Sequence, residues 1–254
     1  MKRRLLGVGV AAAMLLAASS AFAGGVNLSW TNCSGEGTGT NNRTFACASN
    51  AGTNILVCSF VLDADLAQVS GNEFVMDIIS QAATMPAWWD MKDIGTCRQG
   101  SLGFNTIANA GDVVCVDWAS GQSTGGIGAY NNSGIDQTTI SAALQPQWRR
   151  LKVALAVPLS GLQDLVAGTE YFSGNVTVGN QKTVGTGACA GCTSPVCIVL
   201  NSIKVTTPTP ANDVFIGAAG TPGSNIVTWQ GAGADCQSVP AKNRTWGQVK
   251  ALYH

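Results

Sequence analysis

The chain has 254 residues, of which 46% are hydrophobic and only 11% are charged, and its formal net charge is zero. Globular proteins carry about 25% charged residues, so small polar residues must cover much of this surface. The sequence has no basic stripe, which argues against a nucleic-acid partner. Its length suits one large domain, or one domain with a small appendage.

The N-terminus has the features of a cleaved secretory signal peptide over residues 1–23. Residues 2–4 are basic, residues 5–17 are apolar, and residues 21–23 form an A-x-A cleavage site. The apolar run is shorter than the roughly 20 residues that a membrane-spanning helix needs. We therefore expect cleavage after Ala23, no transmembrane segment in the mature chain, and a secreted, extracellular or cell-surface protein, with the periplasm as an alternative. Cleavage leaves 11 Lys and Arg against 14 Asp and Glu, a net charge of about −3.

Alternation of apolar and polar residues is the dominant pattern along the mature chain. In the segment 149–157, Leu151, Val153 and Leu155 share one face, while Arg150 and Lys152 lie on the other. This period is typical of half-buried antiparallel strands. Turn-rich segments such as 121–136 separate the strands. The predicted strands cover residues 26–30, 54–62, 73–79, 112–118, 149–157, 170–178, 196–206, 213–217 and 225–229.

These patterns predict an all-β fold, an antiparallel β-sandwich of the immunoglobulin, cohesin or jelly-roll kind, stapled by disulfides. We expect the sandwich domain to cover residues 24–205. The Pro/Thr connector "TTPTPAND" would then lead into an appendage, so that residues 206–254 hold the connector, two strands and a short helix docked on the sandwich. The helix is predicted in "RTWGQVKALYH", where Thr245 and Gln248 fit a capping box.

Nine cysteines remain in the mature chain, and an exported protein oxidises such a set to a disulfide framework. Local pairs Cys33–Cys47 and Cys97–Cys115 are plausible across two loops. Cys58 lies in the apolar run "NILVCSFVL", so we expect it to be the free thiol. The predicted disulfide cysteines are Cys33, Cys47, Cys97, Cys115, Cys189, Cys192, Cys197 and Cys236.

The segment "GACAGCTSPVCIVLNSIKV" raises other chemistries for its three cysteines. Thr193 follows the C-A-G-C run where a haem-attachment motif needs histidine. A thioredoxin-like site needs a helix after the motif, and a strand pattern follows here. A zinc site of Cys189, Cys192, Cys197 and Cys236 is the remaining alternative. Export favours disulfides, two of which would fasten the tail to the body, and we expect no metal and no cofactor.

Residues for catalysis are few. The only histidine is the terminal His254, and no G-x-S-x-G elbow occurs, so no catalytic residue is assigned. Carboxylate pairs leave one enzymatic alternative, a secreted carbohydrate-active enzyme, because glycoside hydrolysis uses two carboxyl groups. The possible pairs are Glu73 with Asp77, Asp63 with Asp65, and Asp112 with Asp117.

Aromatic residues give the most suggestive binding feature. If Trp88 and Trp89 lie on a strand, their side chains point to opposite faces, so that one indole is exposed. An exposed indole can stack on a sugar or anchor a protein partner. Trp118 and Tyr130 could extend this ligand-binding surface. The alternative is that one tryptophan fills the core and the other packs under a loop.

Several strings, including "VNLSWTNC", "PAWWDMKDIGTCR", "CAGCTSPVCIVLNSIKV" and the ending "NRTWGQVKALY", resemble those of uncharacterised secreted bacterial β-sandwich proteins that end in a TWG-x-x-K-x-x-Y segment. The segment "LSGLQDLVAGTEYFSGNVTV" is similar to a hairpin of cohesin-like and immunoglobulin-like sandwiches. Both resemblances bear on architecture and carry no catalytic residues.

Together these features lead us to expect a secreted, non-catalytic binding or cell-surface module with a glycan or extracellular protein ligand. The carbohydrate-active enzyme and a structural subunit of a surface assembly are the alternatives. An assembly subunit would be favoured by long, open edge strands.

Overall fold

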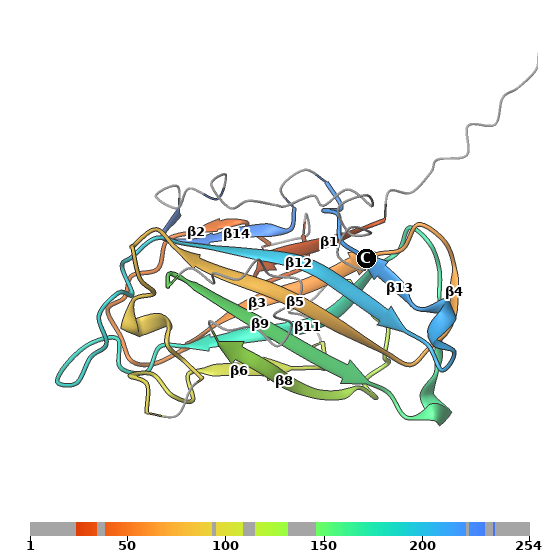
Figure 1. The fold of residues 1–254 in the computed structure, drawn as a ribbon, viewed down its shortest axis with the longest axis horizontal. Helices are drawn as coiled ribbons and strands as arrows, with labels where there is room; N and C mark the ends of the chain where they lie inside the picture. The colour runs from red at the N-terminus through yellow and green to blue at the C-terminus, as the bar shows by residue number, and fades with distance from the viewer. Residues whose placement is uncertain are drawn as a thin grey trace, which may run out of the picture.

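A computed structural model describes residues 24–34, 39–92, 95–108, 115–131, 146–221, 224–231 and 236. Most of its regular elements are β-strands arranged in several sheets (Figure 1). Its helical elements in these residues are three short 3₁₀ turns, η1 (Ala87–Trp89), η2 (Leu159–Gly161) and η3 (Pro210–Asn212). Over the same residues, no helix has the length and apolarity needed to cross a membrane. The predicted all-β class is confirmed at this level.

Five strands form the first sheet. Its order is β1-β3-β11-β6, each neighbouring pair is antiparallel, and β7 runs parallel to β11. The strands are β1 (Gly25–Trp30), β3 (Thr53–Val61), β11 (Glu170–Gly179), β6 (Leu102–Asn105) and β7 (Val116–Asp117).

Seven strands form the second sheet, in the order β2-β14-β12-β5-β9-β8, with β13 also paired to β12. In Figure 1, β12, β5 and β9 lie in front of β3 and β11. The strands are β2 (Asn42–Arg43), β14 (Ile226–Trp229), β12 (Val196–Thr206), β5 (Gly71–Ser80), β9 (Trp148–Ala156), β8 (Thr124–Asn131) and β13 (Val214–Ile216); β4 (Leu66–Val69) and β10 (Gln163–Leu165) form a separate antiparallel pair.

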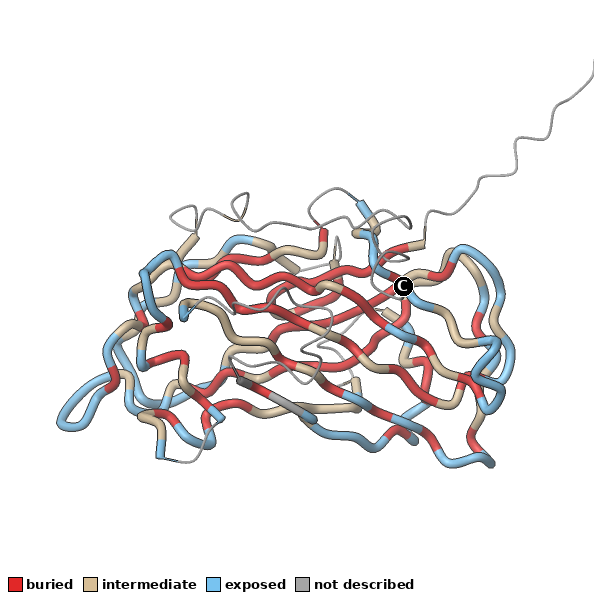
Figure 2. Tube along the Cα trace, viewed as in Figure 1, coloured by how far each residue is buried: buried red, intermediate tan, exposed pale blue. Residues whose placement is uncertain are grey.

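The main hydrophobic core lies between the two sheets. On β5, Phe74, Met76 and Ile78 are at most 1% exposed, and they point to the face opposite Glu73 and Asp77. The ring of Phe74 contacts Phe104 of β6, in the other sheet, with ring centroids 6.0 Å apart. Figure 2 shows the same pattern, with buried residues along the central strands and exposed residues in the loops at both ends.

Gly174 makes room for this contact between the sheets. It follows a register shift in the β11–β3 ladder between Phe172 and Gly174. A Cβ atom at position 174 would lie 2.6 Å from Cε2 of Phe104 and 3.3 Å from Cε1 of Phe74. The position therefore requires glycine because the two aromatic rings fill the space that a side chain would take.

The predicted strands correspond closely to β1, β3, β5, β9, β11, β12, β13 and β14. The turn prediction at 121–136 was wrong in its first half, because β8 begins at Thr124 and pairs with β9. Residues 112–114 of the predicted strand at 112–118 fall outside the described residues. Val116 and Asp117 form β7, and Trp118 already lies in the following turn.

The predicted appendage contributes strands to the second sheet. β13 pairs with one end of β12, at Ile203 to Val205, and β14 pairs with the other end, at Val196 to Val199. The connector at 206–213 contains η3 and returns the chain to β12. The predicted C-terminal helix at 244–254 falls outside the described residues.

Disulfides are confirmed, but both local pairings were wrong. The bonds are Cys33–Cys115, Cys47–Cys192, Cys97–Cys189 and Cys197–Cys236. Three of them join residues 82, 145 and 92 positions apart, because the fold brings segments that are distant in the sequence close together. Two bonds had been expected among Cys189, Cys192, Cys197 and Cys236, but only Cys197 and Cys236 bond to each other.

Candidate functional site

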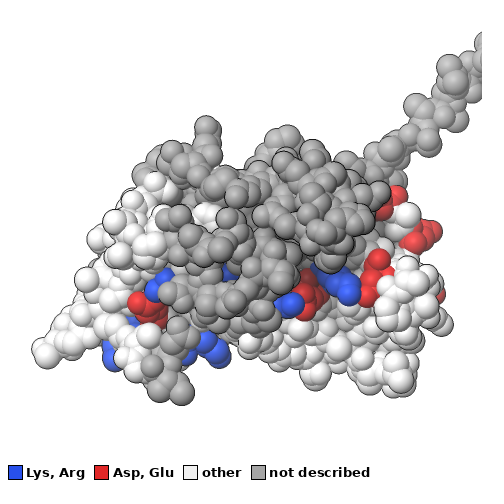
Figure 3. All heavy atoms as spheres, in the orientation of Figure 1, with Lys and Arg blue, Asp and Glu red and all other residues white. Residues whose placement is uncertain are grey.

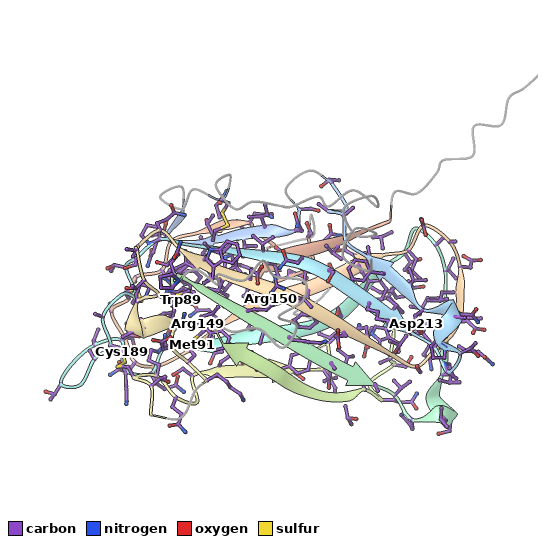
Figure 4. The ribbon with its side chains drawn as sticks, in the orientation of Figure 1. Trp89, Met91, Arg149, Arg150, Cys189 and Asp213 are labelled. Atoms are coloured by element: carbon purple, nitrogen blue, oxygen red, sulfur yellow. A yellow bond between two sulfur atoms is a disulfide. The ribbon has the colours of Figure 1, made fainter. Side chains whose placement is uncertain are left out.

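Two of the sequence features, the Trp88–Trp89 pair and the C-A-G-C loop with Cys189 and Cys192, meet at one end of the two sheets. There, five aromatic rings contact one another, and Figure 4 labels one of them, Trp89. Phe45 stacks on Trp229 at a centroid distance of 3.6 Å, and Trp88 and Trp89 lie 4.8 Å and 5.3 Å from Trp229. Trp30 completes the cluster, 5.0 Å from Phe45. We call these five residues the aromatic cluster.

Trp88 and Trp89 are both fully buried, with 0% of each exposed. They lie in the 3₁₀ turn η1 rather than on a strand, so they do not alternate between opposite faces. Trp88 Nε1 donates to Thr183 Oγ1 at 3.0 Å, while Trp89 Nε1 has no hydrogen-bond partner among the described residues. The expectation of one exposed indole was therefore wrong, because it assumed strand geometry.

The other two predicted binding residues are also buried. Trp118 is 2% exposed and Tyr130 is 3% exposed. The Tyr130 hydroxyl donates to the backbone oxygen of Trp89, so it anchors β8 to η1. The structure thus brings Tyr130 to the aromatic cluster as a core contact. The burial of all four residues removes the exposed surface on which the predicted ligand-binding role depended.

Arg98 supports the aromatic cluster from within the protein, and the sequence analysis missed it. Its side chain is 1% exposed, and its guanidinium carbon lies 3.5 Å from the centre of the Trp88 ring. The guanidinium donates to the backbone oxygens of Trp88 and Gly179. Burial lowers the pKa of Arg98 to about 10, so it stays charged at neutral pH. No motif around Arg98 distinguishes it from a surface arginine.

Two disulfides close the same end of the molecule and explain the C-A-G-C spacing. Cys189 bonds to Cys97, and Cys192 bonds to Cys47. Cys189 and Cys192 are both buried. Between them, Gly191 has a φ of +110°, and a Cβ there would lie 2.2 Å from Cβ of Pro86. The glycine thus lets the loop approach η1, whose Trp88 amide donates to Ala190 O at 2.8 Å. The two cysteines of the C-A-G-C motif therefore serve as disulfide partners in a loop that packs against η1.

Neighbouring charged residues of β5 and β9 form ion pairs on the outer face of the second sheet. Arg150 binds Asp77 with two hydrogen bonds of 2.7 Å, and Lys152 lies 2.8 Å from Glu73. Figure 3 shows basic and acidic atoms next to one another on this face of the molecule, and Figure 4 labels Arg150. Glu73 and Asp77, a predicted carboxylate pair, therefore share a face but each has its own cation.

Two further ion pairs lie at opposite ends of this sheet. Arg149 donates to Asp90 Oδ1 at 2.6 Å beside the aromatic cluster, and Lys204 lies 2.8 Å from Asp213 near β13. Figure 4 shows Arg149 close to Trp89 and Met91, with Asp213 at the far end. The Lys204 ammonium lowers the pKa of Asp213 through their hydrogen bond, helped by the Thr207 amide, and the same bond raises the pKa of Lys204.

Of the remaining predicted carboxylates, Asp63 and Asp65 lie between β3 and β4, and Asp117 ends β7. Asp63 and Asp65 are exposed, and Asp65 Oδ1 accepts the Ala167 amide at 2.8 Å. Asp117 accepts the amides of Ala119 and Gly121, which fixes the turn after β7. Asp112 falls outside the described residues. These contacts are the ordinary roles of short acids at strand ends.

Cys58 is free and fully buried on the core face of β3. Burial raises the pKa of its thiol well above the usual range, which disfavours the reactive thiolate. Across the described residues, no three His, Cys, Asp or Glu side chains come together in a group that could hold a metal ion.

No protein-family model matches the chain, and no match was found among curated proteins. The resemblance to secreted bacterial sandwich proteins therefore stays a prediction, and function must be inferred from the molecule itself.

Proposed function

We propose that this protein is a secreted, non-catalytic β-sandwich that acts as an extracellular binding or cell-surface module with a protein ligand. Four disulfides and the sequence of residues 1–23 support a location outside the cytoplasm. The two facing sheets support the sandwich architecture. Its assignment to an immunoglobulin-like or cohesin-like type rests on the sequence resemblance.

The observation that carries a protein ligand over a glycan is the distribution of aromatic and apolar side chains. The tryptophans of the aromatic cluster are buried, so none offers a flat face to a sugar ring. Large apolar side chains instead reach solvent from loops and edges. Leu159 is 77% exposed, Phe215 is 70% exposed and Val166 is 59% exposed. Exposed apolar residues of this kind favour contacts with protein surfaces.

The carboxylates support a non-catalytic role. Glu73, Asp77, Asp90 and Asp213 each have a cationic partner within 2.8 Å. A retaining or inverting glycosidase needs one carboxyl group that is protonated and another that faces the substrate. Acids that are held in separate ion pairs and turns are poorly suited to supply these two carboxyl groups.

Binding to washed cells of the source organism tests the proposal. Fluorescently labelled mature protein is added to untreated cells, to protease-treated cells and to periodate-treated cells. We expect binding that protease abolishes and that periodate, which oxidises sugars, leaves intact. Periodate-sensitive binding, or hydrolysis of a polysaccharide panel, would contradict the proposal.

A variant pair locates the contact on the protein. Phe215→Ser removes the exposed ring from β13, and Leu159→Ser is the matched control because it removes a similarly exposed apolar side chain from η2. We expect Phe215→Ser to weaken cell binding at least tenfold, because Phe215 is the aromatic residue among these exposed side chains and aromatic residues are enriched at interfaces, and Leu159→Ser to leave binding within twofold. If both substitutions weaken cell binding equally, the contact with the ligand is not specific to β13.

A further inference from the structure

The outer face of the second sheet carries an apolar patch beside its ion pairs. Ile79 of β5 pairs with Cys197 of β12, and Asp77 pairs with Val199. Side chains two residues apart on a strand point to the same face, so Ile79 lies on the outer face with Asp77. Residues that pair directly across two strands also share a face, which places Cys197 and Val199 there as well. We call Ile79, Cys197 and Val199 the outer patch.

The residues of the outer patch are buried although they face away from the core. Ile79 is 6% exposed, Cys197 0% and Val199 7%. None of the three belongs to either hydrophobic cluster of the described residues. On the same face, Phe215 of β13 pairs with Lys204 and is 70% exposed. The outer face is therefore open at the β13 end and closed at the β14 end, which indicates that another part of the chain covers the outer patch.

The Cys197–Cys236 disulfide identifies the segment that can supply this cover. It joins the outer patch directly to residue 236, with the two Cα atoms 5.4 Å apart. Residues 237–254 follow, so this segment starts at the outer patch. An extended chain spans about 3.3 Å per residue and neighbouring strands lie about 4.8 Å apart, so about two or three residues suffice to cross from Cys197 to Ile79 or Val199.

The sequence of residues 237–254 has an apolar side that suits the outer patch. Trp246, Val249 and Tyr253 recur at helical spacing and share one side of the predicted C-terminal helix, whereas Ala251 belongs to the opposite side. A helix of about nine residues is marginal in water on its own. It needs an apolar surface to pack on, and the outer patch is such a surface at the point where the segment is attached.

We propose that residues 237–254 fold back over the outer patch, with Trp246 and Val249 packed against Ile79 and Val199. The disulfide favours this occupant over a second chain or another segment, because it holds the C-terminal segment at the outer patch in every oxidised molecule. The inference goes beyond the proposed function, since the contact lies within one chain. For binding, it means that a protein ligand reaches the outer face beside Phe215 but not at the β14 end.

A matched pair of substitutions in the oxidised mature chain tests this contact. Val249→Ser removes an apolar side chain from the packed side of the predicted helix, and Ala251→Ser is the control on the opposite side. We expect Val249→Ser to lower the melting temperature by about 3–8 °C and Ala251→Ser by less than about 2 °C. Equal shifts for the two variants would overturn the inference.

Val199→Ser extends the test to the sheet. Two residues in contact do not act independently on stability, so Val199→Ser combined with Val249→Ser should lower the melting temperature by at least about 2 °C less than the sum of the two single shifts. Strictly additive shifts would mean that the two side chains do not touch, and the inference would fail.

Photo-cross-linking locates the segment without relying on stability. Val249→p-benzoylphenylalanine places a photoreactive group on the packed side of the predicted helix, and Ala251→p-benzoylphenylalanine places it on the opposite side. After irradiation and peptide mapping, we expect position 249 to link to residues 75–80 or 196–200, and position 251 to give at least about fivefold less of these products. Links from position 249 only to other regions, such as residues 132–145, or to a second chain would overturn the inference. The effect of Phe215→Ser on cell binding does not depend on that outcome, so the proposed function is tested separately.

Discussion

The guanidinium of Arg98 stacks on Trp88 at 3.5 Å from the ring centre and donates to the backbone oxygen of the same residue at 2.8 Å. It also donates to the backbone oxygen of Gly179, at the end of β11. One buried cation thus connects the turn η1 to the first sheet. It has no carboxylate partner among the contacts of the described residues, so the carbonyl oxygens and the indole face are what stabilise its charge.

Replacing Arg98 should therefore destabilise the fold strongly. Arg98→Met keeps the apolar stem but leaves the oxygens of Trp88 and Gly179 without their donor, and we expect a loss of about 2–4 kcal/mol in the free energy of unfolding. Arg43→Met is the control, since Arg43 also stacks on a ring, Phe45 at 4.9 Å, but is only partly buried. We expect Arg43→Met to lower the free energy of unfolding by less than about 1 kcal/mol. Urea denaturation measures both, and similar losses would contradict the role of Arg98.

The disulfide pattern predicts a single thiol that reagents reach only after unfolding. Cys58 is 0% exposed and its thiol pKa is raised by burial, so the native protein should not react with a thiol reagent. In denaturant, one thiol per chain should react, and Cys58→Ala should abolish that reaction. Peptide mapping without reduction should recover the four bonds of the structure. Labelling of Cys189 or Cys192 in the native protein would contradict this arrangement.

The Lys204–Asp213 ion pair predicts a pH dependence at β13. The pKa of Asp213 is lowered in the folded protein, so the stability that it contributes is present above about pH 4 and is lost as the pH falls through the folded value. The pKa of Lys204 is raised, so its contribution is present below about pH 10 and is lost above the folded value. The pair should therefore hold β13 against β12 throughout the range between.

Amide chemical shifts of residues 214–216, followed by NMR from pH 2 to pH 7, measure this effect. We expect a transition below pH 4 in the wild type and a flat profile in Asp213→Asn. Because Lys204 is well exposed, 1 M salt should weaken the transition. A transition that persists in Asp213→Asn would assign it to another group.

Much of the sheet structure could be predicted from the sequence because burial on one face imposes a period of two. β9 is the clearest case, since Leu151, Val153 and Leu155 face the core while Arg150 and Lys152 pair with acids of β5. β8 was missed because "TGGIGAY" has few strand formers. It is a strand because β9 offers it a complete hydrogen-bonding edge, a tertiary effect that local propensity does not contain.

The candidate site was less predictable because it depends on contacts between distant segments. A strand would place Trp88 and Trp89 on opposite faces, whereas the 3₁₀ turn after Pro86 brings both into the core. The partner of Cys47 lies 145 residues away, and nothing near Cys47 in the sequence distinguishes that bond from a local one. Arg98 has no signal at all, since its role comes from where the folded chain places Trp88 and Gly179.

Gly174 tests the packing between the two sheets. Gly174→Ala would place a methyl group 2.6 Å from Cε2 of Phe104, so a ring or a strand must move, and we expect a loss of about 1–3 kcal/mol. Gly126→Ala is the matched control, because it also adds a methyl group to a strand glycine but meets no atom within 4 Å. Its melting temperature should equal or exceed that of the wild type.

A second substitution separates steric overlap from backbone strain at Gly174. Phe104→Leu shortens the side chain that the new methyl group would meet, so Gly174→Ala combined with Phe104→Leu should lose less stability than the sum of the two single variants. Thermal unfolding of dilute, oxidised protein measures all four variants. Strictly additive losses would mean that the need for glycine comes from the backbone at the register shift rather than from the space occupied by Phe104.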